Sequence, residues 1–202
     1  YFVTVQHIQE SLASDPILFE VMSRIPLRPA QPNPDVYFTL LKSIVEQQLS
    51  LKAADTIWNR FLDKFEDYPH PQDVVEIETE LMRSCGLSFQ KAGYMQNIAR
   101  FAIENDLSDA FIASLDDEAA EKHLCQIKGV GKWTAEMILM FSLGREDVFP
   151  VGDLAVRAAM IKLYDVKSEK KQLFVDLESI ADQWRPYRSY GTRLMWDWYL
   201  SR

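Results

Sequence analysis

Hydrophobic residues recur at helical spacing along most of this chain. The first clear run follows Asp35, a residue type that often caps the start of a helix. Its apolar members would fall on one side of that helix: Phe38, Leu41, Ile44 and Val45. Similar runs occupy 53–65, 94–102 and 156–164. No segment of useful length alternates between apolar and polar residues as a half-buried strand does. The pattern therefore predicts an all-α fold.

Cap and turn residues divide the chain into these helices. Asp15 followed by Pro16 is typical of a helix start, and so is Ser50 before the run that begins at Ala53. Four prolines between 26 and 34 predict an irregular connection. A later helix that begins at Trp133 is expected to stop near Gly144.

A glycine-rich turn separates two of the predicted helices. Glycine adopts backbone dihedral angles that side chains forbid, and it lets a ligand approach the main chain closely. Amides at the start of the following helix lack intrahelical partners and attract anions, and Lys128 adds positive charge beside them. The turn therefore predicts a phosphate site, although a purely structural turn is the alternative. The candidate phosphate-binding residues are Gly129, Val130, Gly131, Lys132 and Thr134.

A single carboxylate, Asp153, stands just before the last of the apolar runs. This is the usual place of a helix N-cap. A carboxylate held there would also stabilise positive charge that develops on a nearby substrate. The two interpretations are compatible, because one oxygen can accept from a backbone amide while the group keeps its charge.

Charge and cysteine content limit the function classes. The net charge of −8 opposes nucleic-acid binding unless basic residues cluster locally. Such a cluster is one interpretation of the basic residues near the turn and the C-terminus, and ordinary solvated charge is the other: Lys128, Lys132, Arg157, Lys162, Arg185, Arg188 and Arg193. Two cysteines are too few for a four-cysteine iron–sulfur cluster and favour a reducing compartment. No apolar run is long enough to span a bilayer, and no secretory signal is visible.

The longer string around the turn, Ile-Lys-Gly-Val-Gly-Lys-Trp-Thr-Ala at 127–135, is much more specific than its glycines alone. Together with other segments it resembles the helix-hairpin-helix base-excision DNA glycosylases, and within them the alkylated-base branch, DNA-3-methyladenine glycosylase II. The other matching segments are 14–16, 44–50, 86–88, 91–92, 148–153 and 184–190. The resemblance implies two helical lobes with a DNA-binding cleft. Residues 36–145 would form the lobe that carries the hairpin, and residues 1–35 with 146–202 would form the second lobe, which carries the catalytic aspartate.

The resemblance also implies an activity, which is hydrolysis of the N-glycosidic bond of alkylated purines flipped out of duplex DNA. The expected substrates are 3-methyladenine and 7-methylguanine. Asp153 corresponds to the catalytic residue. Trp133 and Trp196 correspond to aromatic residues of the base pocket, where they would attract a cationic base, and Met137 replaces another pocket aromatic. Gln48 corresponds to the side chain that fills the gap in the duplex, with Leu49 beside it, although an exposed glutamine at a helix end is the alternative.

Trp133 distinguishes this chain from bifunctional relatives, which have a lysine at that position. A tryptophan cannot form a Schiff base, and Lys132 points about 100° away around the helix. The expected enzyme is therefore monofunctional, leaves an abasic site and requires no cofactor. By the resemblance, main-chain carbonyls of Cys125, Ile127 and Val130 would hold a structural Na⁺ or K⁺. We expect an intracellular monomer that binds damaged double-stranded DNA and no membrane, in a bacterial cytoplasm or a eukaryotic nucleus.

Two other functions are compatible with parts of this pattern. A related glycosylase for oxidised or mismatched bases would prefer a neutral lesion, and the missing lysine and missing four-cysteine cluster oppose it. A non-catalytic module that recognises damaged DNA would bind tightly and release no base. The presence of Asp153 together with Trp133 opposes this second alternative.

Overall fold

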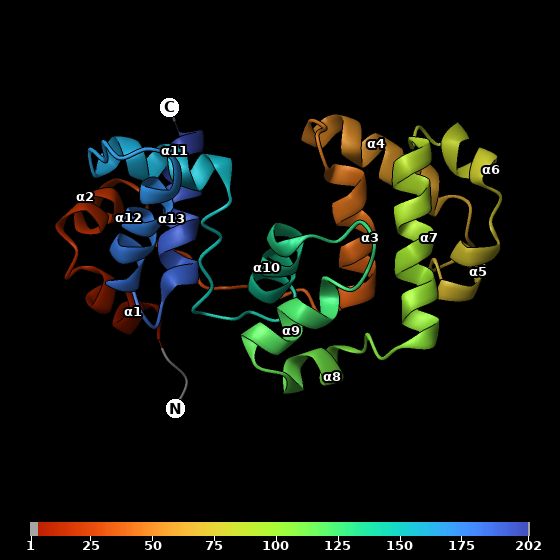
Figure 1. Ribbon diagram of the computed structural model, residues 1–202, viewed down its shortest axis with the longest axis horizontal. Helices are drawn as coiled ribbons and strands as arrows, with labels where there is room; N and C mark the ends of the chain where they lie inside the picture. The colour runs from red at the N-terminus through yellow and green to blue at the C-terminus, as the bar shows by residue number, and fades with distance from the viewer. Residues whose placement is uncertain (1–3, 202) are drawn as a thin grey trace. The chain divides into compact units, whose positions relative to one another are not determined.

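The computed structural model describes residues 4–201, and within that range the chain forms helices and no strands (Figure 1). The all-α prediction is confirmed. The chain divides into two compact units, one from Asn33 to Leu143 and one formed by the residues up to Pro32 with those from Gly144 onward. No helix among the described residues has both the length and the apolar character needed to cross a bilayer.

The middle unit contains eight helices among the described residues: α3 Val36–Glu46, α4 Leu51–Leu62, α5 Pro71–Glu76, α6 Thr79–Ser84, α7 Phe89–Glu104, α8 Asp109–Ser114, α9 Asp117–Leu124 and α10 Lys132–Phe141. The longest of these, α7, packs against both α3 and α5 (Figure 1). Its buried face and that of α3 form the core with α4, and the largest fully buried residues here include Leu40, Ile44, Phe61, Met95 and Ile98.

The unit formed by the two ends of the chain contains α1 Val5–Leu12, α2 Pro16–Arg24, α11 Leu154–Leu163, α12 Lys170–Asp182 and α13 Arg188–Leu200. Trp184 is 1% exposed and lies in a core of apolar residues from all five helices. Helices α1, α12 and α13 were not predicted individually. The residues of α12 that face the core do recur at helical spacing, so the periodic signal was present and was missed: Leu173, Leu177, Ile180 and Ala181.

The unit boundaries differ from the predicted ones by a few residues. The middle unit begins at Asn33 rather than Val36, where the Asn33 amide donates to the carbonyl of Phe141 at 2.8 Å. It ends at Leu143 rather than Arg145, whose carbonyl accepts a hydrogen bond from Ser189 on α13. Residues 1–3 and 202 of the predicted second lobe lie outside the described residues.

Four predicted helix starts are confirmed by side-chain caps. Asp15 accepts from the amides of Ile17 and Leu18, and Asp35 accepts from Phe38. Ser50 and Asp153 cap α4 and α11 in the same way. The predicted end near Gly144 lies within three residues of the observed one. Helix α10 stops at Phe141, and the amides of residues 142 and 143 both donate to the carbonyl of Ile138.

Candidate nucleic-acid interface and active site

The glycine-rich turn joins α9 to α10 as a tight hairpin. Three of its side chains are buried in the protein, those of Leu124, Ile127 and Val130. The Val130 amide donates to the Ile127 carbonyl at 2.9 Å, which closes the turn. Gly131 then stands at the N-cap of α10 and provides no side-chain cap. The start of α10 therefore has the form of a helix N-terminus that attracts anions.

The two glycines of the hairpin have different roles. Gly129 has a φ of +110°, and a Cβ there would lie 2.4 Å from Cγ of Tyr94, so both its backbone and its surroundings require glycine. Gly131 has a φ of −100°, which any residue adopts, so its backbone does not require glycine. A Cβ at Gly131 would meet nothing within 4 Å, so this position leaves room for a ligand to approach the main chain.

The positive charge of Lys132 near the hairpin is less available to bind a phosphate than the sequence suggested. Nζ of Lys132 lies 3.5 Å from a carboxylate oxygen of Glu121 and 3.9 Å from one of Glu136. Thr134 is 3% exposed, so its contact with a phosphate remains a prediction. The main-chain amides and Lys128, which is exposed, are the better candidates for an anion contact.

Helix α7 supports the hairpin through residues that sequence reasoning did not assign to function. The ring of Tyr94 lies directly against Gly129, and Nδ2 of Asn97 donates to the Lys128 carbonyl at 3.2 Å. Tyr94 was interpreted only as part of an apolar stripe. The available signal was the three-residue spacing of polar and aromatic residues on one face of this helix.

The predicted wedge residues lie in the turn between α3 and α4. Gln48 is exposed and has a φ of +59°, and Leu49 is 40% exposed. Trp133 and Met137 lie one turn apart on α10 in the same unit, and Trp133 is 43% exposed. The structure thus presents these four side chains from the middle unit.

The other unit brings Asp153 and Trp196 together. Oδ1 of Asp153 accepts from the Val156 amide at 2.9 Å and from Nε1 of Trp196 at 3.0 Å. The carboxylate is 9% exposed. Rotation of its plane would break both hydrogen bonds, so the two donors fix the orientation of the group. Sequence reasoning missed this contact, which joins residues 43 positions apart.

The segment that leads to Asp153 is anchored on the start of α13. Oγ of Ser189 accepts from the Val148 amide at 2.9 Å and donates to the Arg145 carbonyl at 2.7 Å. Nε of Arg188 donates to Oδ1 of Asp147 at 2.8 Å. Helix α13 therefore holds both the beginning of this segment and, through Trp196, Asp153 at its end.

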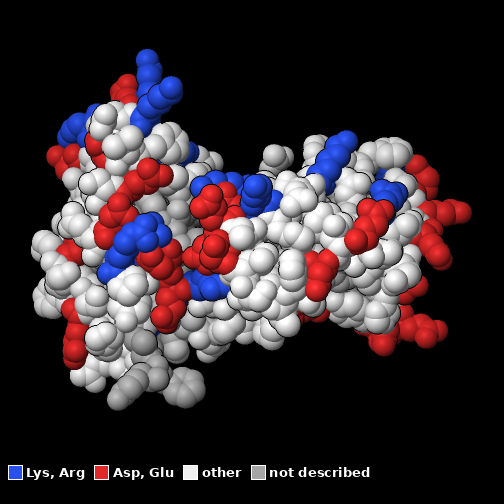
Figure 2. Space-filling view, turned by 60° about the horizontal axis from the view of Figure 1, so that its bottom comes forward, with Lys and Arg blue, Asp and Glu red and all other residues white. Residues whose placement is uncertain are grey.

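Several residues of the expected basic cluster are bonded within the protein. Arg185 and Arg188 pair with Asp147 and Asp182, and the guanidinium of Arg157 lies over the ring of Phe174. Acidic and basic side chains are interspersed on the face drawn in Figure 2. The structure therefore favours ordinary mixed charge over a broad basic face around these arginines.

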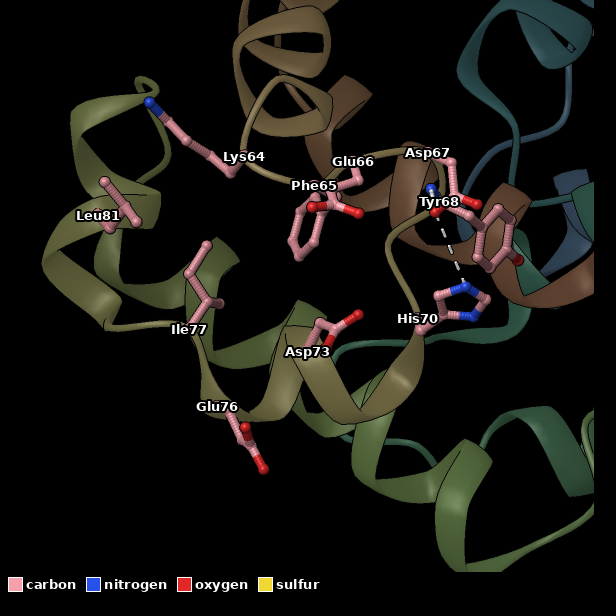
Figure 3. Close-up of a pocket in the computed structure, with 10 residues that line it drawn as sticks. All are labelled: Lys64, Phe65, Glu66, Asp67, Tyr68, His70, Asp73, Glu76, Ile77 and Leu81. Carbon is pink, nitrogen blue, oxygen red and sulfur yellow. Dashed lines mark hydrogen bonds and ion pairs between the residues drawn. The ribbon is translucent and has the colours of Figure 1, made fainter.

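A pocket of about 570 Å³ lies elsewhere in the middle unit (Figure 3). Its lining side chains come from the loop that follows α4, from α5 and α6, and from the link between those two helices: Lys64, Phe65, Glu66, Asp67, Tyr68, His70, Asp73, Glu76, Ile77 and Leu81. Four carboxylates against one lysine would repel a phosphate. This pocket contains none of the predicted site residues and is not the DNA contact.

Side chains of the described residues form no group of three or more His, Cys, Asp or Glu arranged to hold a metal ion. The carbonyls expected to hold a cation belong to the hairpin. That of Ile127 already accepts from the Val130 amide and retains a second lone pair. Carbonyl oxygens are ligands of the kind that a monovalent cation takes, and the cation at this hairpin stays a prediction.

Comparison with known proteins agrees with this geometry. Residues 41–183 match the HhH-GPD superfamily of base excision DNA repair proteins. DNA-3-methyladenine glycosylase 1 of Schizosaccharomyces pombe is 33% identical over 163 residues, which cover 79% of this chain and 71% of that protein. A Bacillus subtilis protein with the provisional name DNA-3-methyladenine glycosylase is 33% identical over 168 residues, which cover 80% of this chain and 58% of the relative.

A solved structure extends the likeness to the fold. The 3-methyladenine DNA glycosylase of Schizosaccharomyces pombe, in complex with abasic DNA, superposes with a TM-score of 0.84 at 28% identity. The match covers 94% of this chain and 95% of that one. The family match over residues 41–183 agrees with the hairpin and the capped aspartate. This chain belongs to the HhH-GPD superfamily of base excision DNA repair proteins.

Proposed function

We propose that this protein is a monofunctional DNA glycosylase that removes alkylated purines from duplex DNA and leaves an abasic site. The expected bases are 3-methyladenine above all, and 7-methylguanine. The observation that carries the proposal is the orientation of Asp153, which is held by Val156 and Trp196 at the start of α11. Family membership and the names of the relatives support the same reaction.

The proposed role of Asp153 follows from the charge that the reaction creates. Breaking an N-glycosidic bond leaves positive charge on the sugar, and a fixed carboxylate stabilises it without reorganisation. The same group would orient or deprotonate the attacking water. An alkylated purine such as 3-methyladenine is cationic and leaves as a neutral base, so a strong general acid is not required. The Trp196 donor adds to this arrangement because it holds the carboxylate in one orientation.

The described contacts also oppose a lysine nucleophile at the hairpin. Trp133 occupies the position where bifunctional relatives have a lysine. Lys132, the neighbouring residue, points about 100° away around the helix, and its Nζ lies beside carboxylate oxygens of Glu121 and Glu136. The expected product is an intact strand with an abasic site.

The remaining site residues would contact the DNA backbone and the flipped nucleotide. The hairpin amides would contact a backbone phosphate without reading sequence, and Gln48 with Leu49 would fill the gap left by the flipped nucleotide. The flipped base would stack against Trp133 and Trp196, with Met137 completing the pocket. We expect one protein molecule to act on each lesion, inside a cell, where damaged DNA is found.

A structural cation completes the proposal. Na⁺ or K⁺ would be held by the carbonyls of Cys125, Ile127 and Val130 and would face a DNA phosphate. Such an ion would help to neutralise the phosphate at the hairpin. Asp153 and the leaving base account for the chemical step, so the reaction itself requires no cofactor.

The test compares base release by the wild type and by Asp153→Asn on duplex DNA that contains 3-methyladenine and 7-methylguanine. Asparagine caps a helix about as well as aspartate but carries no charge, so the variant should fold and lose at least about a hundredfold in rate. Asp116→Asn, which changes an exposed N-cap on α9, is the matched control. Strand cutting should appear only after alkali.

Three results would contradict the proposal. Binding without base release would indicate a recognition module. Preference for a neutral oxidised base would indicate a different substrate class. A covalent protein–DNA complex trapped by borohydride would refute the monofunctional mechanism.

A further inference from the structure

The turn that carries Gln48 has a strained backbone. A φ of +59° places this non-glycine residue in the left-handed region, which is unfavourable for an L-amino acid. Such conformations persist only where surrounding contacts impose them, and they concentrate at functional sites. Gln48 is exposed and does not itself pack into a core, so the constraint must act on its neighbours.

Lys91 on α7 binds the chain just before Gln48. Its Nζ donates to the carbonyl of Val45 at 2.8 Å and to that of Gln47 at 2.7 Å. These carbonyls lie at the C-terminal end of α3, where the last turn lacks intrahelical donors and a positive charge is favourable. Burial lowers the pKa of Lys91, so placing the ammonium here has a cost that the two hydrogen bonds offset.

The same face of α7 reaches the hairpin. Lys91, Tyr94 and Asn97 are spaced three residues apart, so they form one ridge along the helix. Tyr94 lies against Gly129 and Asn97 binds the Lys128 carbonyl, while Lys91 binds the end of α3. One rigid helix thus determines the separation between the hairpin and the turn that presents Gln48.

We propose that Lys91 is a positioning residue that holds Gln48 and Leu49 ready to enter the duplex, in register with the phosphate contact of the hairpin. The proposal rests on the proposed function, because it assumes that these two segments contact DNA. Lys91 does not touch the reacting atoms. It acts by keeping the strained turn formed before DNA arrives, so that binding does not have to order it.

Two simpler roles for Lys91 make different predictions. A lysine that only caps α3 would affect stability and leave DNA recognition unchanged. A lysine that binds a phosphate directly would weaken binding to damaged and undamaged DNA alike. A positioning residue affects only the complexes in which the turn enters the duplex.

The experiment uses the whole chain with Lys91→Met, which keeps the length of the side chain and removes its donors. Two duplexes of equal length are compared, one undamaged and one with a tetrahydrofuran abasic analogue beside 2-aminopurine, whose fluorescence rises when it unstacks. We expect about tenfold weaker binding to the abasic duplex and a correspondingly smaller fluorescence rise, with binding to the undamaged duplex unchanged within about twofold. Lys91→Arg, which keeps donors at this site, should restore both signals.

The inference is overturned if Lys91→Met lowers only the melting temperature, or if it weakens binding to both duplexes equally. If Lys91→Met does not fold, Lys91→Gln, with its shorter amide donor, is measured in the same way and must show the same selective loss. These readouts need no base release. A wild type that unstacks 2-aminopurine but releases no alkylated base would therefore refute the proposed function and leave this inference standing.

Discussion

Asp15 shows how much one buried carboxylate contributes to the unit formed by the chain ends. Its Oδ1 accepts from the first amides of α2, and its Oδ2 accepts from Oη of Tyr164 at 2.6 Å and from Nε1 of Trp184 at 2.9 Å. The residue is 4% exposed. All the donors around it are satisfied by one group, so its removal would leave several buried polar groups without a partner.

We predict that Asp15→Ala lowers the free energy of unfolding by about 3–5 kcal/mol, since the cap and two buried side-chain hydrogen bonds are lost together. Urea unfolding of the purified protein measures the change. Asp116→Ala is the control, because Asp116 is exposed and caps only α9, and its loss should cost about 1 kcal/mol. Equal losses in the two variants would show that the buried network contributes nothing beyond capping.

At the scale of elements, the two glycines of the hairpin should affect different properties, Gly129 mainly folding and Gly131 mainly binding. Gly129→Ala would place a methyl group 2.4 Å from the Tyr94 ring at a φ of +110°. We expect a loss of at least about 2 kcal/mol in unfolding free energy, together with weaker DNA binding, because α7 and the hairpin must move apart. Gly93→Ala is the control: it lies within α7, its Cβ would meet nothing within 4 Å, and it should stabilise the helix by about 0.5–1 kcal/mol.

The second glycine of the turn should behave in the opposite way. Gly131→Ala meets no neighbour and has an ordinary φ, so we expect a stability change of about 1 kcal/mol or less. Its methyl group would occupy the space through which a phosphate approaches the amides, and DNA affinity should fall about tenfold. Fluorescence anisotropy with a labelled duplex measures this loss, and unchanged affinity would show that no phosphate binds closely at Gly131.

At the scale of the whole molecule, each unit contains a tyrosine that makes its stability sensitive to alkali, buried in the case of Tyr37 and half-buried in the case of Tyr164. Tyr37 in the middle unit donates to the Pro69 carbonyl at 2.9 Å, and Tyr164 in the other unit donates to Asp15. Burial is the main cause that raises the pKa of both phenols above the ordinary value of 10.0, and nearby carboxylates add to it. The folded protein therefore keeps these protons where the unfolded chain releases them.

The sign of the effect follows from this difference. The contribution of each tyrosine is fully present below about pH 10 and is lost as the pH rises above that value, by about 1.4 kcal/mol per pH unit for each group. Tyr37→Phe and Tyr164→Phe should each reduce the slope of unfolding free energy against pH by that amount between about pH 10 and 11.5. Urea titrations at several pH values measure the slopes. Identical slopes for wild type and variants would show that these phenols also ionise in the folded protein.

Local signals determined a large part of this molecule. A cap such as Asp35 or Ser50 involves one residue and the amides of the next few, so the sequence alone predicts it. The periodic runs that form α3 and α7 are local in the same sense, because one turn of helix places their apolar residues on one side. The hairpin and Asp153 were also identified from the sequence, since their residue types and order are specific.

Tertiary structure decided the contacts between residues that are distant in the chain. The hydrogen bond from Trp196 to Asp153, the hold of Lys91 on the end of α3 and the pairing of Arg188 with Asp147 all join separate helices or loops. Their partners depend on how whole helices pack, which no local pattern records. The sequence therefore determined which residues are candidates for the chemistry. Packing decided how those residues are held, because a hydrogen bond between distant segments forms only when their helices pack together.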